Sequence, residues 1–164
     1  MLSPERVAGL GPVVELVGSL NSFCVREVDR TVRCWGSVNT AFGITDPLLG
    51  HTKTIVDVPR EATSLAVTWD RLCYVLPGGQ AECRGARNNA QLGDGVRSDL
   101  PESRFVPVTR FADIEALALG LDHSCALRRD GSVWCWGSHR TGSVDGVIRE
   151  FEYAVNPVEV IPPR

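Results

Sequence analysis

The six cysteines of this 164-residue chain are the side chains whose spacing most clearly suggests chemistry. They form three pairs, in which the second cysteine follows the first by ten positions: Cys24/Cys34, Cys73/Cys83 and Cys125/Cys135. Paired thiols can form a disulfide or bind a metal ion, and a thiol beside a histidine can act as a nucleophile. His123 stands two positions before Cys125, so the cysteine of the third pair could be any of these. The secondary structure that positions these residues distinguishes a disulfide, a metal site and a nucleophile.

A repeated frame surrounds the cysteine pairs. Each copy has the form Cys, nine residues, Cys, one residue, Gly, and the first cysteines are 49 and then 52 residues apart. Self-similarity at a period of about 50 residues is typical of solenoids and propellers. We expect a single domain over 1–164, with repeats at approximately 12–58, 59–109 and 110–163.

The third copy predicts a β-hairpin in which Cys125 opposes Cys135. The two strands then flank a three-residue loop that ends at Gly131. The last position of such a loop is left-handed, a region that glycine enters without a Cβ penalty. The second copy has Gly79 there. The first has Arg30, which would cost about 1 kcal/mol of backbone strain.

Both faces of this hairpin are apolar, with Leu127 and Val133 beside the cysteines and Trp134 and Trp136 opposite. Strands of this kind belong to sheets that are covered on both sides, as propeller blades are. An apolar run precedes each hairpin, and a Pro/Val segment follows it at 54–59, 106–111 and 156–163. Proline confines a strand to a sheet edge. We therefore expect an all-β chain of about three four-stranded antiparallel blades, a partial propeller.

The segment from Gly120 to Gly137, with Gln91–Gly95, resembles the regulator of chromosome condensation repeat family. The second copy departs from the pattern at Arg84, where the family usually has tryptophan, and the first lacks the Gln-Leu-Gly loop at 37–43. The resemblance implies a β-propeller ring of seven blades, of which this chain supplies about three. Cysteine pairs in every repeat are similar to the bacterial branch, whose members are often exported. The positions with an implied structural role are Trp35, Gly36, Gly79, Gly85, Gly93, Gly120, His123, Gly131, Trp134, Trp136 and Gly137.

One disulfide within each blade is the favoured interpretation of the cysteines. Opposed residues of an antiparallel pair have Cα atoms about 4.5–5.5 Å apart, within the range that a disulfide accepts. Each bond would stabilise the fold by less than about 3 kcal/mol. Zinc needs four converging ligands, and pairs on separate blades do not converge. Helical hairpins with this spacing are disfavoured by the Asp-Gly and Gly-Gly turns. Reduced thiols in the core remain the alternative.

Other candidate residues favour structural roles. Neighbouring strand residues alternate faces, so His123 is expected to support the fold rather than activate Cys125. His51 and His139 fall in predicted loops. The loop acids Asp94, Asp99 and Glu102 do not have the spacing of an EF-hand, and a turn is favoured over calcium.

The tryptophans and arginines complete the candidates. Trp35, Trp134 and Trp136 are predicted to pack between blades, whereas Trp69 aligns near His123 and could line a central surface. The arginines at 84, 87, 97, 104, 128 and 129 are scattered rather than arranged in a stripe.

Composition excludes several classes of protein. Charged residues make up 23% and apolar residues 43% of the chain, unlike a disordered segment. No apolar run approaches the roughly 20 residues of a membrane span. The net charge of −3 gives no basic footprint for nucleic acid. Residues 1–18 show no signal-peptide pattern, which contrasts with the export that the cysteines suggest.

These observations favour a non-enzymatic scaffold that binds an unknown protein partner through propeller loops, without cofactor, metal or catalytic residues. The alternatives are a regulator of a small GTPase, by guanine-nucleotide exchange as the family name implies, and an exported enzyme inhibitor. We expect an extracellular or cell-envelope location, with the cytoplasm as the alternative. A partial propeller further predicts self-association or additional blades in a longer chain.

Overall fold

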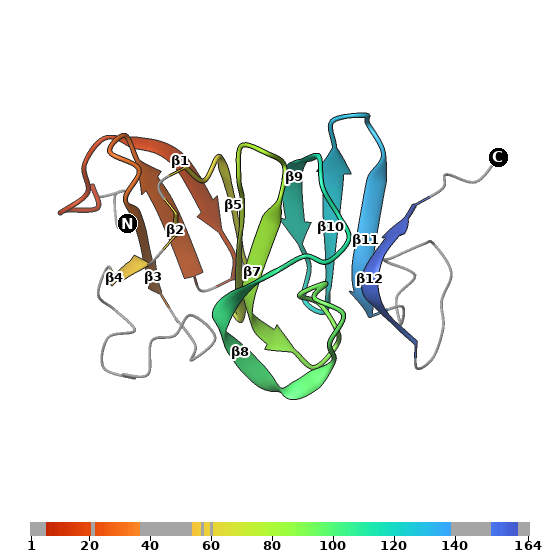
Figure 1. Cartoon of the computed structure of the whole chain (residues 1–164). Coiled ribbons are helices and arrows are strands. Elements are labelled where there is room, and N and C mark those ends of the chain that lie inside the picture. Colours follow the sequence, from red (N-terminus) through yellow and green to blue (C-terminus); the bar gives the residue numbers. More distant parts are fainter. Residues whose placement is uncertain are drawn as a thin grey trace, which may run out of the picture.

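A computed structural model of the chain describes residues 6–20, 22–36, 54–56, 58–59, 61–138 and 152–160. The described residues form three four-stranded antiparallel sheets, which stand side by side as blades (Figure 1). The predicted all-β propeller architecture is confirmed. His51, His139 and the predicted loop at 37–43 lie outside the described residues, and so does the end of the 156–163 segment.

Each blade follows the chain in order. The first blade contains β1 (Val13–Gly18), β2 (Ser22–Glu27), β3 (Val32–Gly36) and β4 (Thr54–Val56). The second contains β5 (Ser64–Val67), β6 (Arg71–Val75), β7 (Ala81–Arg87) and β8 (Ser98–Pro107). The third contains β9 (Ile114–Leu119), β10 (His123–Arg128), β11 (Val133–Ser138) and β12 (Tyr153–Glu159). No helix in these described ranges is long and apolar enough to cross a membrane.

The strands with proline lie at sheet edges. β8, with Pro101 and Pro107, and β12, with Pro157, are the last strands of their sheets. An edge strand tolerates proline because the missing N–H is not needed for a ladder. The outer strand of the second blade was predicted at 106–111, and this is wrong. The strand β7 continues to Arg87, and β8 runs from Ser98 to Pro107.

The three hairpins share one turn. In the third blade Cys125 opposes Cys135, as predicted, and the Arg128 N–H donates to the Ser132 oxygen at 2.9 Å, which closes a three-residue loop. Gly131 at its last position has a φ of 85°. The equivalent Gly79 and Arg30 have φ values of 76° and 69°, so the arginine does occupy the left-handed region, as expected.

Each cysteine pair is joined by a disulfide across its hairpin. The Cα separations are 4.1 Å for Cys24–Cys34, 4.1 Å for Cys73–Cys83 and 4.0 Å for Cys125–Cys135. The first two disulfides are fully buried and belong to the clusters of apolar side chains between neighbouring blades. In these two blades the cysteine face therefore packs against the next blade.

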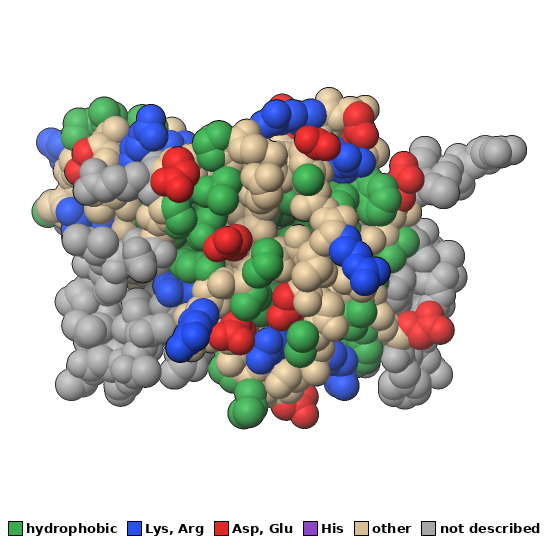
Figure 2. Space-filling view, in the orientation of Figure 1, with side chains coloured by type: hydrophobic (Ala, Val, Ile, Leu, Met, Phe, Trp, Pro, Cys, Tyr) green, Lys and Arg blue, Asp and Glu red, His purple; other side chains and the backbone are tan. Residues whose placement is uncertain are grey.

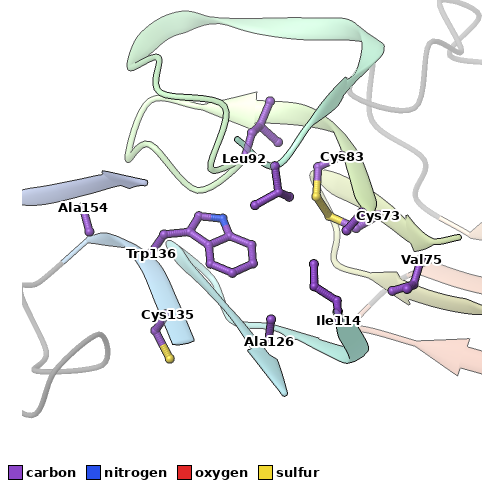
Figure 3. Close-up of a cluster of buried hydrophobic side chains, with 11 residues drawn as sticks. Cys73, Val75, Cys83, Leu92, Ile114, Ala126, Cys135, Trp136 and Ala154 are labelled. Atoms are coloured by element: carbon purple, nitrogen blue, oxygen red, sulfur yellow. A yellow bond between two sulfur atoms is a disulfide. The ribbon is translucent and has the colours of Figure 1, made fainter. Parts of the chain in front are cut away.

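Trp136 is the largest buried side chain, and its ring fills the space between the second and third blades (Figure 3). It belongs to a cluster with Leu92, Ile114 and the Cys73–Cys83 disulfide. Trp136 therefore packs between blades, as predicted, because its face of β11 looks toward the second blade. Val17 of the first blade also packs inward, whereas Leu16 is exposed.

The glycine that follows each second cysteine by two positions allows a close backbone contact. A Cβ on Gly85 would lie 2.1 Å from the Asp70 oxygen, and one on Gly137 would lie 2.6 Å from the Asp122 oxygen. The next residue in each blade donates its N–H to that same oxygen, at 3.0 Å from Ala86 and 2.9 Å from Ser138. These glycines thereby hold the turn before the first cysteine, which carries the candidate site.

Candidate binding cleft at one rim

A cleft of about 480 Å³ opens at the rim where the second and third blades meet. Its walls are the β5–β6 turn, the end of β7 with the loop after it, the start of β8, and the β9–β10 turn. The residues that line it are Trp69, Asp70, Ala86, Arg87, Asn88, Asn89, Gln91, Asp99, Pro101, Leu121 and Asp122. This set is called the rim cleft below.

A tight turn presents Trp69 to the rim cleft. The Thr68 N–H donates to the Arg71 oxygen at 2.8 Å, and the Thr68 hydroxyl donates to Oδ1 of Asp70 at 2.7 Å. These bonds fix the backbone around Trp69, whose side chain remains at the tip. The residue is 40% exposed. The turn therefore holds the backbone of Trp69 in place and leaves part of its side chain open to a ligand.

Arg71 joins the Trp69 turn to the third blade. It is fully buried, and its guanidinium donates to the backbone oxygens of Gly120, Leu121 and His123, with the Leu121 bond at 2.9 Å. Its Nη1 also lies 3.3 Å from Oδ1 of Asp70. Burial lowers the pKa of the Arg71 guanidinium to about 10, and the charges of Asp70 and Asp122 oppose this shift. The side chain therefore stays charged at neutral pH.

Arg71 is not among the candidate residues predicted from the sequence. In the second blade it takes the place of His123, since each stands two positions before its first cysteine and pairs with the glycine of its blade, Gly85 or Gly137. Trp69 accordingly aligns with Leu121, two positions earlier than expected. The sequence does contain a signal for this role, because Arg71 is a charged residue at the start of an otherwise apolar strand.

The loop after β7 is anchored on the third blade. The backbone oxygen of Gln91 accepts hydrogen bonds from the Ser124 hydroxyl at 2.8 Å and from Trp136 Nε1 at 2.9 Å. Further along, the Gly95 N–H donates to the Val155 oxygen at 3.1 Å. Two blades therefore build one continuous wall, and the rim cleft does not depend on a free loop.

Two of the three predicted loop acids, Asp94 and Glu102, interact with residues of this loop and its flanking strand. Asp94 and Glu102 each lie 3.3 Å from Nη1 of Arg87, and Oδ1 of Asp94 accepts the Val96 N–H at 3.1 Å. This favours the predicted turn over a calcium site. Asp99 is exposed at the start of β8. In the described ranges, no group of three or more His, Cys, Asp or Glu side chains is arranged for a metal ion.

His123 does not face a free thiol. The sulfur of Cys125 is bonded to Cys135, and Nδ1 of His123 lies 3.1 Å from Oδ1 of Asp122. The Ser124 hydroxyl is buried on Gln91. The alternative of a His123–Cys125 nucleophile is therefore wrong for the disulfide-bonded protein.

The remaining tryptophans and arginines lie away from the rim cleft. Trp35 stacks on Phe23, and Trp134 packs on Phe111 in the segment between blades, so both are half-buried rather than enclosed like Trp136. Three arginines cover aromatic rings: Arg84 on Phe105, Arg97 on Tyr153 and Arg128 on Phe111.

Comparisons with known proteins support the propeller fold described above. The family model of the regulator of chromosome condensation (RCC1) repeat matches residues 114–142, within the third blade. Among curated proteins, mouse and human E3 ubiquitin-protein ligase HERC2 are each 24% identical over 143 residues, covering 81% of this chain. The chain spans 3% of the length of these relatives.

Solved structures show the same fold. Prp20p from Saccharomyces cerevisiae matches with a TM-score of 0.78 and 17% identity, over 96% of this chain and 40% of that one. Human WBSCR16 matches with a TM-score of 0.67 and 18% identity, over 92% and 40%. Together these comparisons show that the chain carries an RCC1-type repeat at residues 114–142 and shares the β-propeller fold of these structures.

Proposed function

We propose that the chain is a non-enzymatic protein-binding scaffold whose contact surface is the rim cleft. The observation that carries this proposal is the exposure of Trp69 and Leu121, 40% and 64%, at the tips of two turns joined by the buried Arg71. Loops on a rigid framework commonly carry recognition. Tryptophan is also among the residues that contribute most to protein interfaces.

The relatives support a protein partner in general terms. Prp20p was characterised for its binding to Gsp1p and histones, and yeast RCC1 (Prp20) has been solved bound to Kap60. At 17% and 13% identity these likenesses carry the fold alone. The three disulfides support an oxidising compartment. We therefore place the partner of this chain outside the cell or in the cell envelope.

Site-specific photo-cross-linking tests the proposal. A photoreactive residue at position 121 is expected to capture one discrete protein partner. The same residue at Val28, which is 61% exposed in the β2–β3 turn at the opposite rim, is the matched control and should not capture it. Trp69→Ala should reduce the capture at position 121. Equal capture from both positions would contradict a specific rim surface.

The nucleotide-exchange alternative makes a different prediction. It requires that the purified chain accelerate release of guanine nucleotide from a small GTPase. If the Trp69→Ala variant accelerates nucleotide release as well as the unmodified chain does, the function belongs to a surface other than the rim cleft. An absence of acceleration, with capture at position 121, would support the scaffold.

A further inference from the structure

We propose that the rim cleft accepts a positively charged side chain, lysine or arginine, from an exposed segment of the protein partner. This inference rests on the proposed function and specifies what the contact surface recognises. It follows from the charges that line the cleft and from the position of Trp69 among them.

Three carboxylates and one guanidinium line the cleft, from Asp70, Asp99, Asp122 and Arg87. The positive charge of Arg87 is already balanced, because its Nη1 lies 3.3 Å from both Asp94 and Glu102. The buried Arg71 in turn balances Asp70 from beneath. No unbalanced cation in this lining remains to attract an anion.

Asp99 and Asp122 are then the carboxylates that face a ligand. Asp99 is exposed, and the side chain of Asp122 is 29% exposed, with His123 Nδ1 as a neighbour at 3.1 Å. Figure 2 shows the wider setting, in which acidic and basic side chains lie close together over β8. The charge left over within the cleft is negative, so it favours a cation.

Trp69 adds a surface that suits a cationic side chain. An ammonium or guanidinium within about 6 Å of an indole ring is attracted to the ring face, and tryptophan is the best aromatic for this contact. The chain already covers Phe105, Tyr153 and Phe111 with its own arginines. Within the part of the chain that the structure describes, no arginine covers Trp69. A partner's side chain would fill that place, with its apolar stem on the indole and its charge toward the carboxylates.

Titration of the full, disulfide-bonded chain with capped peptides tests this inference. The indole N–H signal of Trp69, assigned by its loss in Trp69→Phe, is followed by NMR. Peptides of the form Gly-Lys-Gly and Gly-Arg-Gly should shift the signal saturably. Their neutral analogues, with norleucine or citrulline, should bind at least tenfold more weakly. Added salt should weaken the charged peptides selectively.

Charge variants give the second arm. The double variant Asp99→Asn/Asp122→Asn should weaken lysine-peptide binding about tenfold, which corresponds to about 1.4 kcal/mol. Asp130→Asn, at an exposed site on the opposite rim, is the matched control and should leave it unchanged. Equal binding of neutral peptides, or unchanged binding by the double variant, would overturn the inference. Tighter binding of spermidine than of any peptide would assign the cleft to a free amine and overturn it as well.

These outcomes separate the two proposals. If cross-linking from position 121 captures a partner but the double asparagine variant captures it equally well, the scaffold stands and the selection of a cation fails. If lysine peptides bind at Trp69 but no partner is captured, the protein-binding function fails while the preference of the cleft for a cation remains.

Discussion

The indole of Trp136 donates its Nε1 hydrogen to the backbone oxygen of Gln91, 2.9 Å away, across the boundary between the second and third blades. Both residues are buried, and the Ser124 hydroxyl donates to the same oxygen at 2.8 Å. A Cβ on Gly93 would lie 2.7 Å from Trp136 Nε1, so the loop lies directly on the ring. The loop of one blade thus covers the tryptophan of the next.

This shared acceptor predicts coupling between Trp136 and Ser124. Trp136→Phe and Ser124→Ala each leave Gln91 one donor and should each cost about 1 kcal/mol, apart from packing. The double variant leaves a buried oxygen with neither donor and should cost about 1 kcal/mol more than the sum. Urea unfolding of the four proteins measures the coupling. Strict additivity would show that the two bonds act independently.

The sequence predicted the repeat, the hairpin register and the cysteine pairing, because these depend on local spacing and turn chemistry. It did not predict which neighbouring blade covers Trp136. Both faces of β11 are apolar, so the sequence pattern is the same whichever blade each face contacts. The Gln91–Gly95 motif was visible as a family feature, but its partner 45 residues away was not. Arg71 was missed because a buried arginine is rare and depends on carbonyls that only the folded chain brings together.

Arg71 is predicted to be a major contributor to stability. Arg71→Met should cost about 3–5 kcal/mol, because it leaves Asp70 and three backbone oxygens without their buried cation. Thermal unfolding monitored by circular dichroism measures the effect. Arg129→Met is the matched control. Arg129 donates to the Pro77 oxygen but is exposed, and its loss should change stability by no more than about 0.5 kcal/mol. Equal effects would contradict the role given to burial.

The shared hairpin turn predicts opposite effects of substitution at equivalent positions. Arg30→Gly should stabilise the protein by about 1 kcal/mol, because it relieves a left-handed arginine. Gly131→Ala should cost about 1 kcal/mol, since nothing lies within 4 Å of the added Cβ and only the backbone is strained. Gly79→Ala should cost more, because its Cβ would lie 2.7 Å from Asp113 Cα. Equal costs at the two glycines in urea unfolding would contradict this account.

The disulfides are predicted to differ in their access to reductant. Cys24–Cys34 and Cys73–Cys83 are fully buried between blades, whereas Cys125 is half-buried on the outer face of the third blade. Under mild reduction of the folded protein, Cys125 and Cys135 should be alkylated first. Peptide mapping with and without reductant measures the order, and the same maps should show the bonds 24–34, 73–83 and 125–135. Free thiols throughout, or links between different pairs, would contradict the structure.

The outer faces of the first and third blades predict association end to end. On the first blade Leu16 and Phe23 are 65% and 42% exposed on the face turned away from the second blade, and Trp35 stacks on Phe23 there. On the third blade Leu127 and Val133 are 39% and 40% exposed on the outer face. Open apolar faces of this kind usually mark an interface, and propellers contain at least four blades. Two chains would supply six blades.

Light scattering with matched variants tests this association. We expect a mass above that of the monomer, and we expect Phe23→Asp to return the chain toward monomer because it places a charge at the centre of the contact. Leu20→Asp is the control, since Leu20 is 79% exposed but lies in the β1–β2 turn at the rim rather than on the face. A monomer that melts cooperatively would show that three blades are sufficient, and the exposed faces would then need no partner.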